Sequence, residues 1–120
     1  MSDPGAPPLV YVDDEPALCR VMKLVLEQAG LRVVCFSDPG EALAFMEREP
    51  VALVMCDQRM PHMTGLELLA RVRQDVPYVL VTGDYSFRAE AEADPRVRAI
   101  VEKPFKYAEL VALLRALLDE

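Results

Sequence analysis

The chain has 120 residues, 52% of them hydrophobic and 28% charged, which is typical of one soluble globular domain and too short for two cores. Its formal net charge of −7 argues against a direct nucleic-acid surface, because such a surface needs clustered Lys and Arg. No apolar run approaches the roughly 20 residues that span a bilayer, and no charged-then-apolar leader opens the chain, so we expect a cytoplasmic protein without membrane contact.

Apolar runs and helical stripes alternate along the chain after a short lead-in. Residues 1–8 contain three prolines and one glycine, which predicts a disordered N-terminal segment and leaves residues 9–120 as the domain. Periodicity and turn residues then predict strands and helices in alternation. In chain order they are strand 9–12, helix 15–29, strand 31–36, helix 41–48, strand 51–56, helix 66–72, strand 79–81, helix 86–93, strand 97–101 and helix 107–118.

Two of the predicted helices differ in how clearly they are amphipathic. Helix 15–29 carries one apolar stripe, formed by Leu18, Val21, Met22, Val25, Leu26 and Ala29. Helix 86–93 has few apolar residues and is followed by Asp94-Pro95-Arg96, so we expect it to be short or mobile.

The cysteines lie in apolar segments without a CxxC pair, so we expect reduced, buried side chains at Cys19, Cys35 and Cys56.

The alternation of five strands with five helices predicts an α/β fold. Parallel neighbouring strands need crossover connections of about a dozen residues, which the helices supply. The apolar character of strands 51–56 and 79–81 fits burial on both faces of a sheet. Right-handed crossovers with helices on both faces give a doubly wound, five-stranded parallel sheet. In such sheets, ligands bind beyond the carboxyl ends of the strands.

Polar side chains follow four of the predicted strands. Asp13 and Asp14 follow the first strand, Asp57 the third, Thr82 the fourth and Lys103 the fifth. Taken alone, the acids could cap the first helix, Asp57 could be an N-cap or turn residue, Thr82 a strand former and Lys103 a surface charge. Their shared position at one edge of one sheet favours a common site.

These residue types are suited to phosphoryl transfer. Carboxylates held together repel one another, and a hard divalent cation with oxygen-only ligands, Mg²⁺ or Mn²⁺, relieves that repulsion. One carboxylate that faces outward could act as a nucleophile and form an acyl phosphate. A hydroxyl and an ammonium group, from Thr82 and Lys103, could then hold phosphoryl oxygens.

Four motifs resemble those of the receiver domains of bacterial two-component response regulators, proteins similar to the chemotaxis regulators. The motifs are Val12–Pro16, Asp57–Gly65, Val81–Gly83 and Lys103–Phe105, and the resemblance extends over about residues 9–118. It implies a flavodoxin-like fold with strand order 2-1-3-4-5. It also implies a phosphorelay signalling switch rather than an enzyme acting on an external substrate, although the domain catalyses its own phosphorylation and slow dephosphorylation.

The resemblance assigns a role to each site residue. Asp57 is the expected phosphoacceptor, Thr82 the switch hydroxyl and Lys103 the cation that pairs with the phosphoryl group. The expected magnesium ligands are Asp13, Asp14, Asp57 and the backbone carbonyl of Arg59. The peptide bond between Lys103 and Pro104 is expected to be cis, as in the family.

The resemblance also implies partners for this domain. A sensor histidine kinase or a phosphotransfer protein would donate the phosphoryl group, and a downstream output domain or protein would read the switched surface. The last helix has a core stripe that includes Leu110 and Leu114, and its further apolar residues Val111 and Leu118 are available for a phosphorylation-dependent dimer or a linker helix.

Two features depart from the family pattern. The family usually carries Tyr or Phe three residues before the lysine, but this chain has Ile100, which could also be plain strand core. We therefore hypothesise that output depends on movement of loops and helices rather than on an aromatic flip. Arg59 and Asp84 occupy the two variable positions that flank the site, and the sequence gives no direction for their effect on phosphoryl lifetime.

Two alternative functions remain open from the sequence. A receiver-like interaction module that signals without phosphorylation is disfavoured by the complete set of polar site residues, although Ile100 leaves it open. A magnesium-dependent phosphatase or mutase with an aspartate nucleophile would place that nucleophile after the first strand in an Asp-x-Asp pattern and would need a cap. Here Asp57 follows the third strand, and the chain has no room for a cap.

Overall fold

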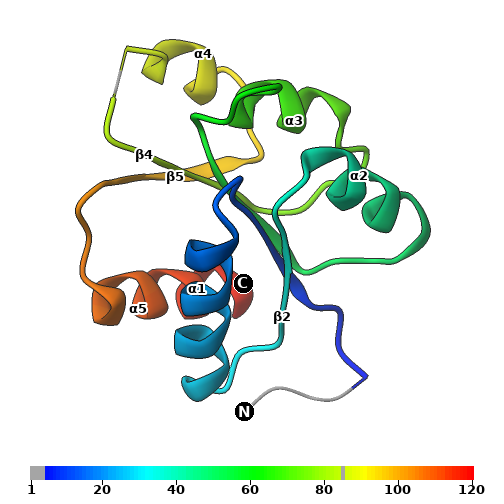
Figure 1. Ribbon diagram of the computed structural model, residues 1–120, viewed down its shortest axis with the longest axis vertical. Helices are drawn as coiled ribbons and strands as arrows, with labels where there is room; N and C mark the ends of the chain where they lie inside the picture. The colour runs from blue at the N-terminus through cyan, green and yellow to red at the C-terminus, as the bar shows by residue number, and fades with distance from the viewer. Residues whose placement is uncertain (1–4, 85) are drawn as a thin grey trace.

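The computed structural model describes residues 5–84 and 86–120 and shows strands and helices in strict alternation (Figure 1). In chain order the elements are β1 Leu9–Val12, α1 Pro16–Gln28, β2 Val33–Phe36, α2 Pro39–Arg48, β3 Leu53–Asp57, α3 Gly65–Arg71, β4 Tyr78–Thr82, α4 Arg88–Glu92, β5 Val97–Glu102 and α5 Tyr107–Leu118. Every predicted element is present, and the predicted alternation is confirmed.

The strands form one parallel sheet in the order β2-β1-β3-β4-β5. Leu9 of β1 pairs with Val33 of β2 on one side and with Leu53 of β3 on the other. The chain therefore moves outward from β1 to β2 and then crosses back to β3, which places the reversal of strand order between β1 and β3. This is the doubly wound, flavodoxin-like fold that the sequence predicted, and ligands of such sheets bind at this point of reversal.

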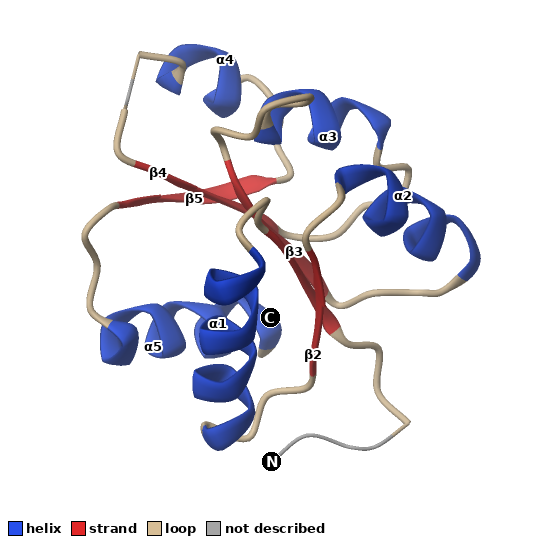
Figure 2. Ribbon diagram, in the orientation of Figure 1, coloured by secondary structure: helices blue, strands red, loops and turns tan. Residues whose placement is uncertain are grey.

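Helices cover both faces of the sheet (Figure 2). The helices α1 and α5 pack on one face, and α2, α3 and α4 pack on the other. Alternate strand residues point to opposite faces, so Tyr11 and Met55 join the core under α1 and α5, while Val12 and Cys56 join the core under α2, α3 and α4. Two apolar layers thus hold the carboxyl ends of β1 and β3 side by side.

The strands β3, β4 and β5 each extend one residue past the carboxyl end of the apolar run that predicted them. Asp57 is the last residue of β3 and pairs with Val81, and Thr82 is the last residue of β4 and pairs with Glu102. A polar residue ends an apolar pattern but continues a backbone ladder, because the ladder needs only main-chain groups. Both polar residues are therefore positioned by the sheet itself rather than by a loop.

The predicted lead-in lies partly outside the described residues, which begin at Gly5. Residues 5–8 contain no helix or strand. Pro8 is buried, and its carbonyl oxygen accepts a hydrogen bond of 2.9 Å from the Ala52 amide. The packed part of the domain thus includes Pro8, one residue before the predicted boundary.

The apolar stripe predicted for the first helix is wrong at two positions. In α1 the buried residues are Cys19, Met22 and Leu26, whereas the side chains of Leu18 and Val21 are 39% and 44% exposed. The helix covers the edge of the sheet at β1 and β2, and a narrow contact of this kind buries one line of side chains rather than a broad stripe. Two large apolar side chains of the predicted stripe are consequently left on the surface of α1.

The fourth helix is short, as predicted. It has five residues, Arg88–Glu92, and buries only Ala91. In the part of the chain that the structure describes, none of the helices combines the length and the apolar character that crossing a membrane requires.

Candidate functional site

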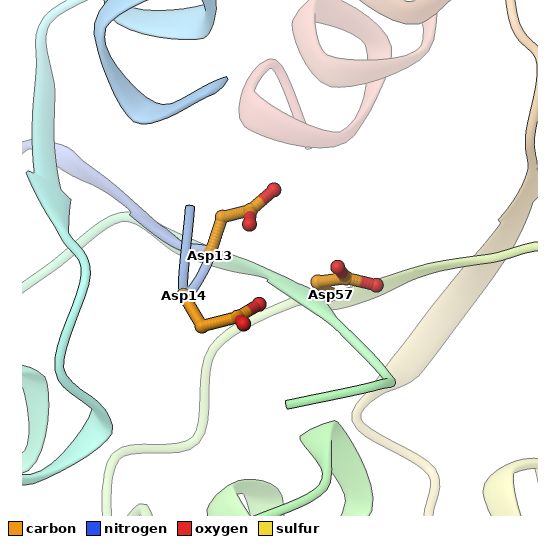
Figure 3. A group of neighbouring side chains, drawn as sticks. All are labelled: Asp13, Asp14 and Asp57. Carbon is orange, nitrogen blue, oxygen red and sulfur yellow. The ribbon is translucent and has the colours of Figure 1, made fainter. Parts of the chain in front are cut away.

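Three carboxylates meet at the carboxyl edge of the sheet. Asp13 and Asp14 follow β1, and Asp57 ends β3, so the side chains come from the two strands between which the strand order reverses (Figure 3). Each offers an oxygen, and these oxygens all lie within 4.8 Å of one another. The structure thus brings together the three acids that the sequence predicts at one edge of the sheet.

Asp13 is held in place by two hydrogen bonds. The Tyr11 hydroxyl donates to Asp13 Oδ2 at 2.7 Å, and the Glu15 amide donates to Oδ1 at 3.0 Å. Burial raises the pKa of Tyr11, and its hydrogen bond to Asp13 raises that pKa further, so the phenol stays protonated and remains a donor. The sequence pattern predicts only that Tyr11 belongs to a strand. Its position two residues before an acid on the same strand face was the available signal.

The acids after β1 do not cap the following helix with their side chains. The N-cap residue of α1 is Glu15, and its side chain makes no capping hydrogen bond. Asp57 is likewise not an N-cap, because Thr64 caps α3 in a capping box with Glu67. The side-chain capping role that the sequence left open for these acids is therefore wrong, whereas Asp57 does accept from the Arg59 amide two residues on, as a turn residue does.

Asp57 is buried and lies beside a cation. Its exposed fraction is 7%, Lys103 Nζ donates to Oδ2 at 3.2 Å, and the Arg59 amide donates to Oδ1 at 3.4 Å. Burial raises the pKa of Asp57, and the charge of Asp13 adds to this rise, while Lys103 opposes it. The carboxylate is thus both desolvated and adjacent to like charge, a state that a cation or an incoming electrophile would relieve.

The ladder between β4 and β5 positions Lys103. Its amide donates to the Thr82 carbonyl at 2.8 Å, which places the residue directly after β5 at the end of β4. The peptide bond from Lys103 to Pro104 is cis, as expected. The ammonium group then reaches across β4 to Asp57 on β3.

Thr82 is buried at the end of β4, and its hydroxyl is engaged with Asp84. Thr82 Oγ1 accepts from the Asp84 amide at 3.0 Å and donates to the Asp84 carbonyl at 3.1 Å. The Asp84 carboxylate in turn accepts from Arg59 Nη2 at 3.1 Å. The structure therefore connects Thr82 to the loop after Asp57 through an ion pair that sequence analysis did not predict.

A close backbone approach fixes the loop that follows Asp57. The Gly65 amide donates to the Gln58 carbonyl at 3.0 Å, and the Tyr78 hydroxyl donates to the Gly65 carbonyl at 2.8 Å. A Cβ at Gly65 would lie 2.6 Å from Leu80 Cδ2 and 3.0 Å from the Asp57 carbonyl oxygen, so only glycine fits. Tyr78 and Gln58 are thus supports of the site that the sequence pattern did not reveal.

The three cysteines are free thiols, as expected. Cys19 and Cys56 are buried and Cys35 is half-buried. Burial is the largest influence on the Cys35 thiol and raises its pKa to about 12. Cys19 donates to the Asp13 carbonyl at 3.2 Å and so helps to fix the start of the acidic loop.

The donor set fits a hard divalent cation. The acidic group consists of Asp13, Asp14 and Asp57, and neither histidine nor cysteine belongs to it. Oxygen ligands with several negative charges favour Mg²⁺ or Mn²⁺ over softer metals. The hydrogen bonds from Tyr11 and the Glu15 amide hold the Asp13 carboxylate in a fixed orientation, as the hydrogen-bond partners of metal ligands do.

The chain is similar in sequence and in fold to known proteins. Residues 9–115 match the family described as the response regulator receiver domain. The chain is 35% identical over 120 residues to the cyclic di-GMP phosphodiesterase response regulator RpfG of Xanthomonas campestris pv. campestris. That alignment covers 92% of this chain and 32% of RpfG, so the chain spans less than two thirds of this relative.

Solved structures show the same fold. A receiver domain protein from Methanospirillum hungatei JF-1 superposes with a TM-score of 0.86 at 28% identity, covering 96% of this chain and 95% of the other. The response regulator TrrA of Thermotoga maritima, in complex with Mg²⁺ and BeF, superposes with a TM-score of 0.81 at 25% identity over 93% of this chain and 99% of TrrA.

The fold and the acidic edge define an α/β domain of the receiver type. The chain belongs to the response regulator receiver domain family, whose members are signalling switches in two-component systems.

Proposed function

We propose that this domain accepts a phosphoryl group on Asp57 from a phosphohistidine of a sensor kinase or phosphotransfer protein. The observation that carries the proposal is the position of Asp57, a buried carboxylate with Lys103 Nζ at 3.2 Å and two further carboxylates beside it. A carboxylate in this setting can attack phosphorus only if the charges around it are balanced, and Lys103 supplies part of that balance.

The proposed step makes one bond and breaks one. An Asp57 oxygen forms an O–P bond as the N–P bond of the donor phosphohistidine breaks, and the electron pair returns to the imidazole. Lys103, already at Asp57, is placed to hold an oxygen of the transferred group, and the Thr82 hydroxyl can hold another once it leaves Asp84. Positioning and charge neutralisation, rather than acid–base chemistry, carry the transfer.

We propose Asp13, Asp14, Asp57 and the Arg59 carbonyl as the ligands of Mg²⁺. The cation would neutralise the three carboxylates and the charge that develops on the phosphoryl oxygens. Tyr11 and the Glu15 amide keep the Asp13 carboxylate oriented for this role. The same residues would be needed for slow hydrolysis of the acyl phosphate by water.

The surface beside the site favours a protein as the donor. A hollow next to Asp13 and Lys103 is lined by Leu18, Phe105 and Tyr107, and both Leu18 and Tyr107 are exposed. Apolar side chains exposed at the rim of a charged site are suited to contact with another protein. We propose that a helix of the phosphoryl donor packs here. On the output side, Ile100 is packed against the core, so we propose that movement of loops and helices carries the signal.

Intact mass spectrometry after incubation with acetyl phosphate and Mg²⁺ tests the phosphoacceptor. We expect a single phosphoryl adduct on the wild type, and no adduct on Asp57→Asn or in samples without metal. The matched control is Asp75→Asn, which changes an exposed aspartate in the α3–β4 connection and should keep the adduct. A folded wild type that gains no adduct under any metal condition would overturn the proposal and favour an interaction module that signals without phosphorylation.

A further inference from the structure

We infer that the ion pair between Arg59 and Asp84 is a latch that keeps the Thr82 hydroxyl on Asp84 and so opposes its binding to a phosphoryl group on Asp57. The inference deepens the proposed function and rests on it. It names a regulatory contact specific to the side chains of this chain.

The first observation is the state of the Thr82 hydroxyl. It accepts from the Asp84 amide and donates to the Asp84 carbonyl, so its single proton is committed to the β4–α4 loop. To donate to a phosphoryl oxygen on Asp57, the hydroxyl must give up its bond to the Asp84 carbonyl. Any contact that stabilises Asp84 in its present position therefore stabilises the state in which Thr82 is not available.

The second observation is that Asp84 is held from both sides. Its carboxylate accepts from Arg59 Nη2 at 3.1 Å across the mouth of the site. It also accepts from the Ser86 amide at 2.9 Å and from the Ser86 hydroxyl at 3.1 Å within its own loop. Arg59 is itself adjacent to the acceptor, because its amide donates to Asp57 Oδ1 at 3.4 Å. The ion pair consequently connects the loop after the phosphoacceptor to the loop that leads into α4.

The strength of this contact suits a reversible latch. The side chains of Arg59 and Asp84 are 80% and 42% exposed. Exposed ion pairs of this kind change an equilibrium by roughly 1.4- to 5-fold. A contact of this size biases Thr82 without preventing its movement when a phosphoryl group is present.

A double-mutant cycle tests the latch. We would measure the dissociation constant of beryllofluoride, a phosphoryl mimic, at saturating Mg²⁺ for the full chain, Arg59→Met, Asp84→Asn and the double variant. Arg59→Met keeps the backbone carbonyl and an unbranched side chain, and Asp84→Asn keeps an oxygen that can accept from the Ser86 amide. Independent effects of either charge on an anion cancel in the cycle, so the coupling factor isolates the ion pair.

If the latch exists, each single substitution already removes the ion pair. The second substitution in the double variant then adds no further gain in affinity from loss of the pair. The coupling factor is defined as the product of the wild-type and double-variant dissociation constants divided by the product of the two single-variant constants, and it is then about 1.4–5. A factor of 1, or one below 1, overturns the latch. If no protein in the cycle binds beryllofluoride while the fold is intact, the proposed phosphoacceptor function fails as well.

A second readout follows the hydroxyl itself. In the free protein, the Thr82 methyl resonance of both single variants should move toward its position in the beryllofluoride-bound wild type. A methyl resonance that stays at its wild-type position in the variants would contradict the inference. The matched control for the double-mutant cycle is the exposed ion pair between Lys23 and Glu27 on α1, at 3.6 Å. A cycle with Lys23→Met and Glu27→Gln should give a coupling factor of 1.

Discussion

Two arginine–aspartate ion pairs flank α4. Their distances are similar, but their exposure to solvent and the other partners of their arginines differ. Arg96 lies beside Asp94 between α4 and β5, with Nη2 at 3.0 Å from the carboxylate and side chains 19% and 28% exposed. Arg59 meets Asp84 before α4, with a similar distance of 3.1 Å but side chains 80% and 42% exposed. Distance alone therefore says little about what an ion pair does.

The other partners of each arginine explain the difference. The Arg96 guanidinium also donates to three backbone carbonyls, those of Leu69, Val72 and Gln74, at and beyond the end of α3. The last carbonyls of a helix lack the full set of intrahelical partners, and Arg96 donates to that of Leu69 in α3 and to those of Val72 and Gln74 just beyond the helix. The Arg96 guanidinium and the Arg96 amide both donate to the Asp94 carboxylate and lower the pKa of Asp94, so the pair stays charged. One pair is a structural connection, whereas the other is free to open.

The largest effect that tests this comparison is loss of Arg96. Arg96→Met removes the donor to three carbonyls that are partly shielded from water, so we expect the free energy of unfolding to fall by about 2–3 kcal/mol. Arg59→Met should change it by less than about 0.5 kcal/mol in the same experiment. Urea denaturation followed by circular dichroism measures both, and equal losses for the two variants would show that the comparison is wrong.

A smaller effect concerns another ion pair, between Lys103 and Asp57, in which the carboxylate is desolvated. Because burial raises the pKa of Asp57, its ionised form destabilises the fold, and Asp57→Asn should raise the free energy of unfolding by about 1 kcal/mol at pH 7.5 without metal. Added Mg²⁺ should stabilise the wild type more than Asp57→Asn.

The sign of the pH dependence follows from the direction of that shift. The folded protein holds the Asp57 proton to higher pH than the unfolded chain, in which the pKa of this carboxyl is about 3.8. Stability from this group is therefore full below the unfolded value and is lost as pH rises through the folded value. The difference between Asp57→Asn and wild type should vanish near pH 3 and grow toward neutrality. A difference that does not vary with pH would contradict this.

The smallest effect is that of salt. At 1 M NaCl the screening length is about 3 Å, and exposed charges are screened far more than half-buried ones. The coupling factor between Arg59 and Asp84 should therefore fall toward 1 in a cycle repeated at 1 M NaCl, while the loss of stability in Arg96→Met should persist. A coupling factor that is unchanged by salt would show that Arg59 and Asp84 interact through backbone movement rather than through charge.

Sequence reasoning located the site residues because they follow buried strands. Asp13, Asp57, Thr82 and Lys103 each come at or directly after the end of an apolar run, and parallel strands bring such ends to one edge. The sequence did not reveal that Tyr11 binds Asp13, because an alternating pattern shows which face a residue occupies but not which atom it contacts. The sequence also could not show that the side chains of Asp13 and Asp14 do not cap α1.

The burial of α1 shows the same limit. Leu18 and Val21 lie on the apolar stripe that periodicity predicts, yet they are exposed, whereas Cys19, which is not part of that stripe, is buried. Periodicity gives the direction of a face but not the width of the surface that covers it. That width depends on where α1 lies over the sheet, which other strands and helices decide.

The sequence by itself determined the alternation of elements, the parallel sheet and the set of polar residues at its carboxyl edge, because these follow from local patterns that repeat every two or 3.6 residues. Only the tertiary structure decided which side chains pair across the loops. Arg59 and Asp84 are 25 residues apart, and Arg96 and Leu69 are 27 apart. Such contacts depend on how the crossovers place the ends of separate strands and helices, and local pattern carries no information about that distance.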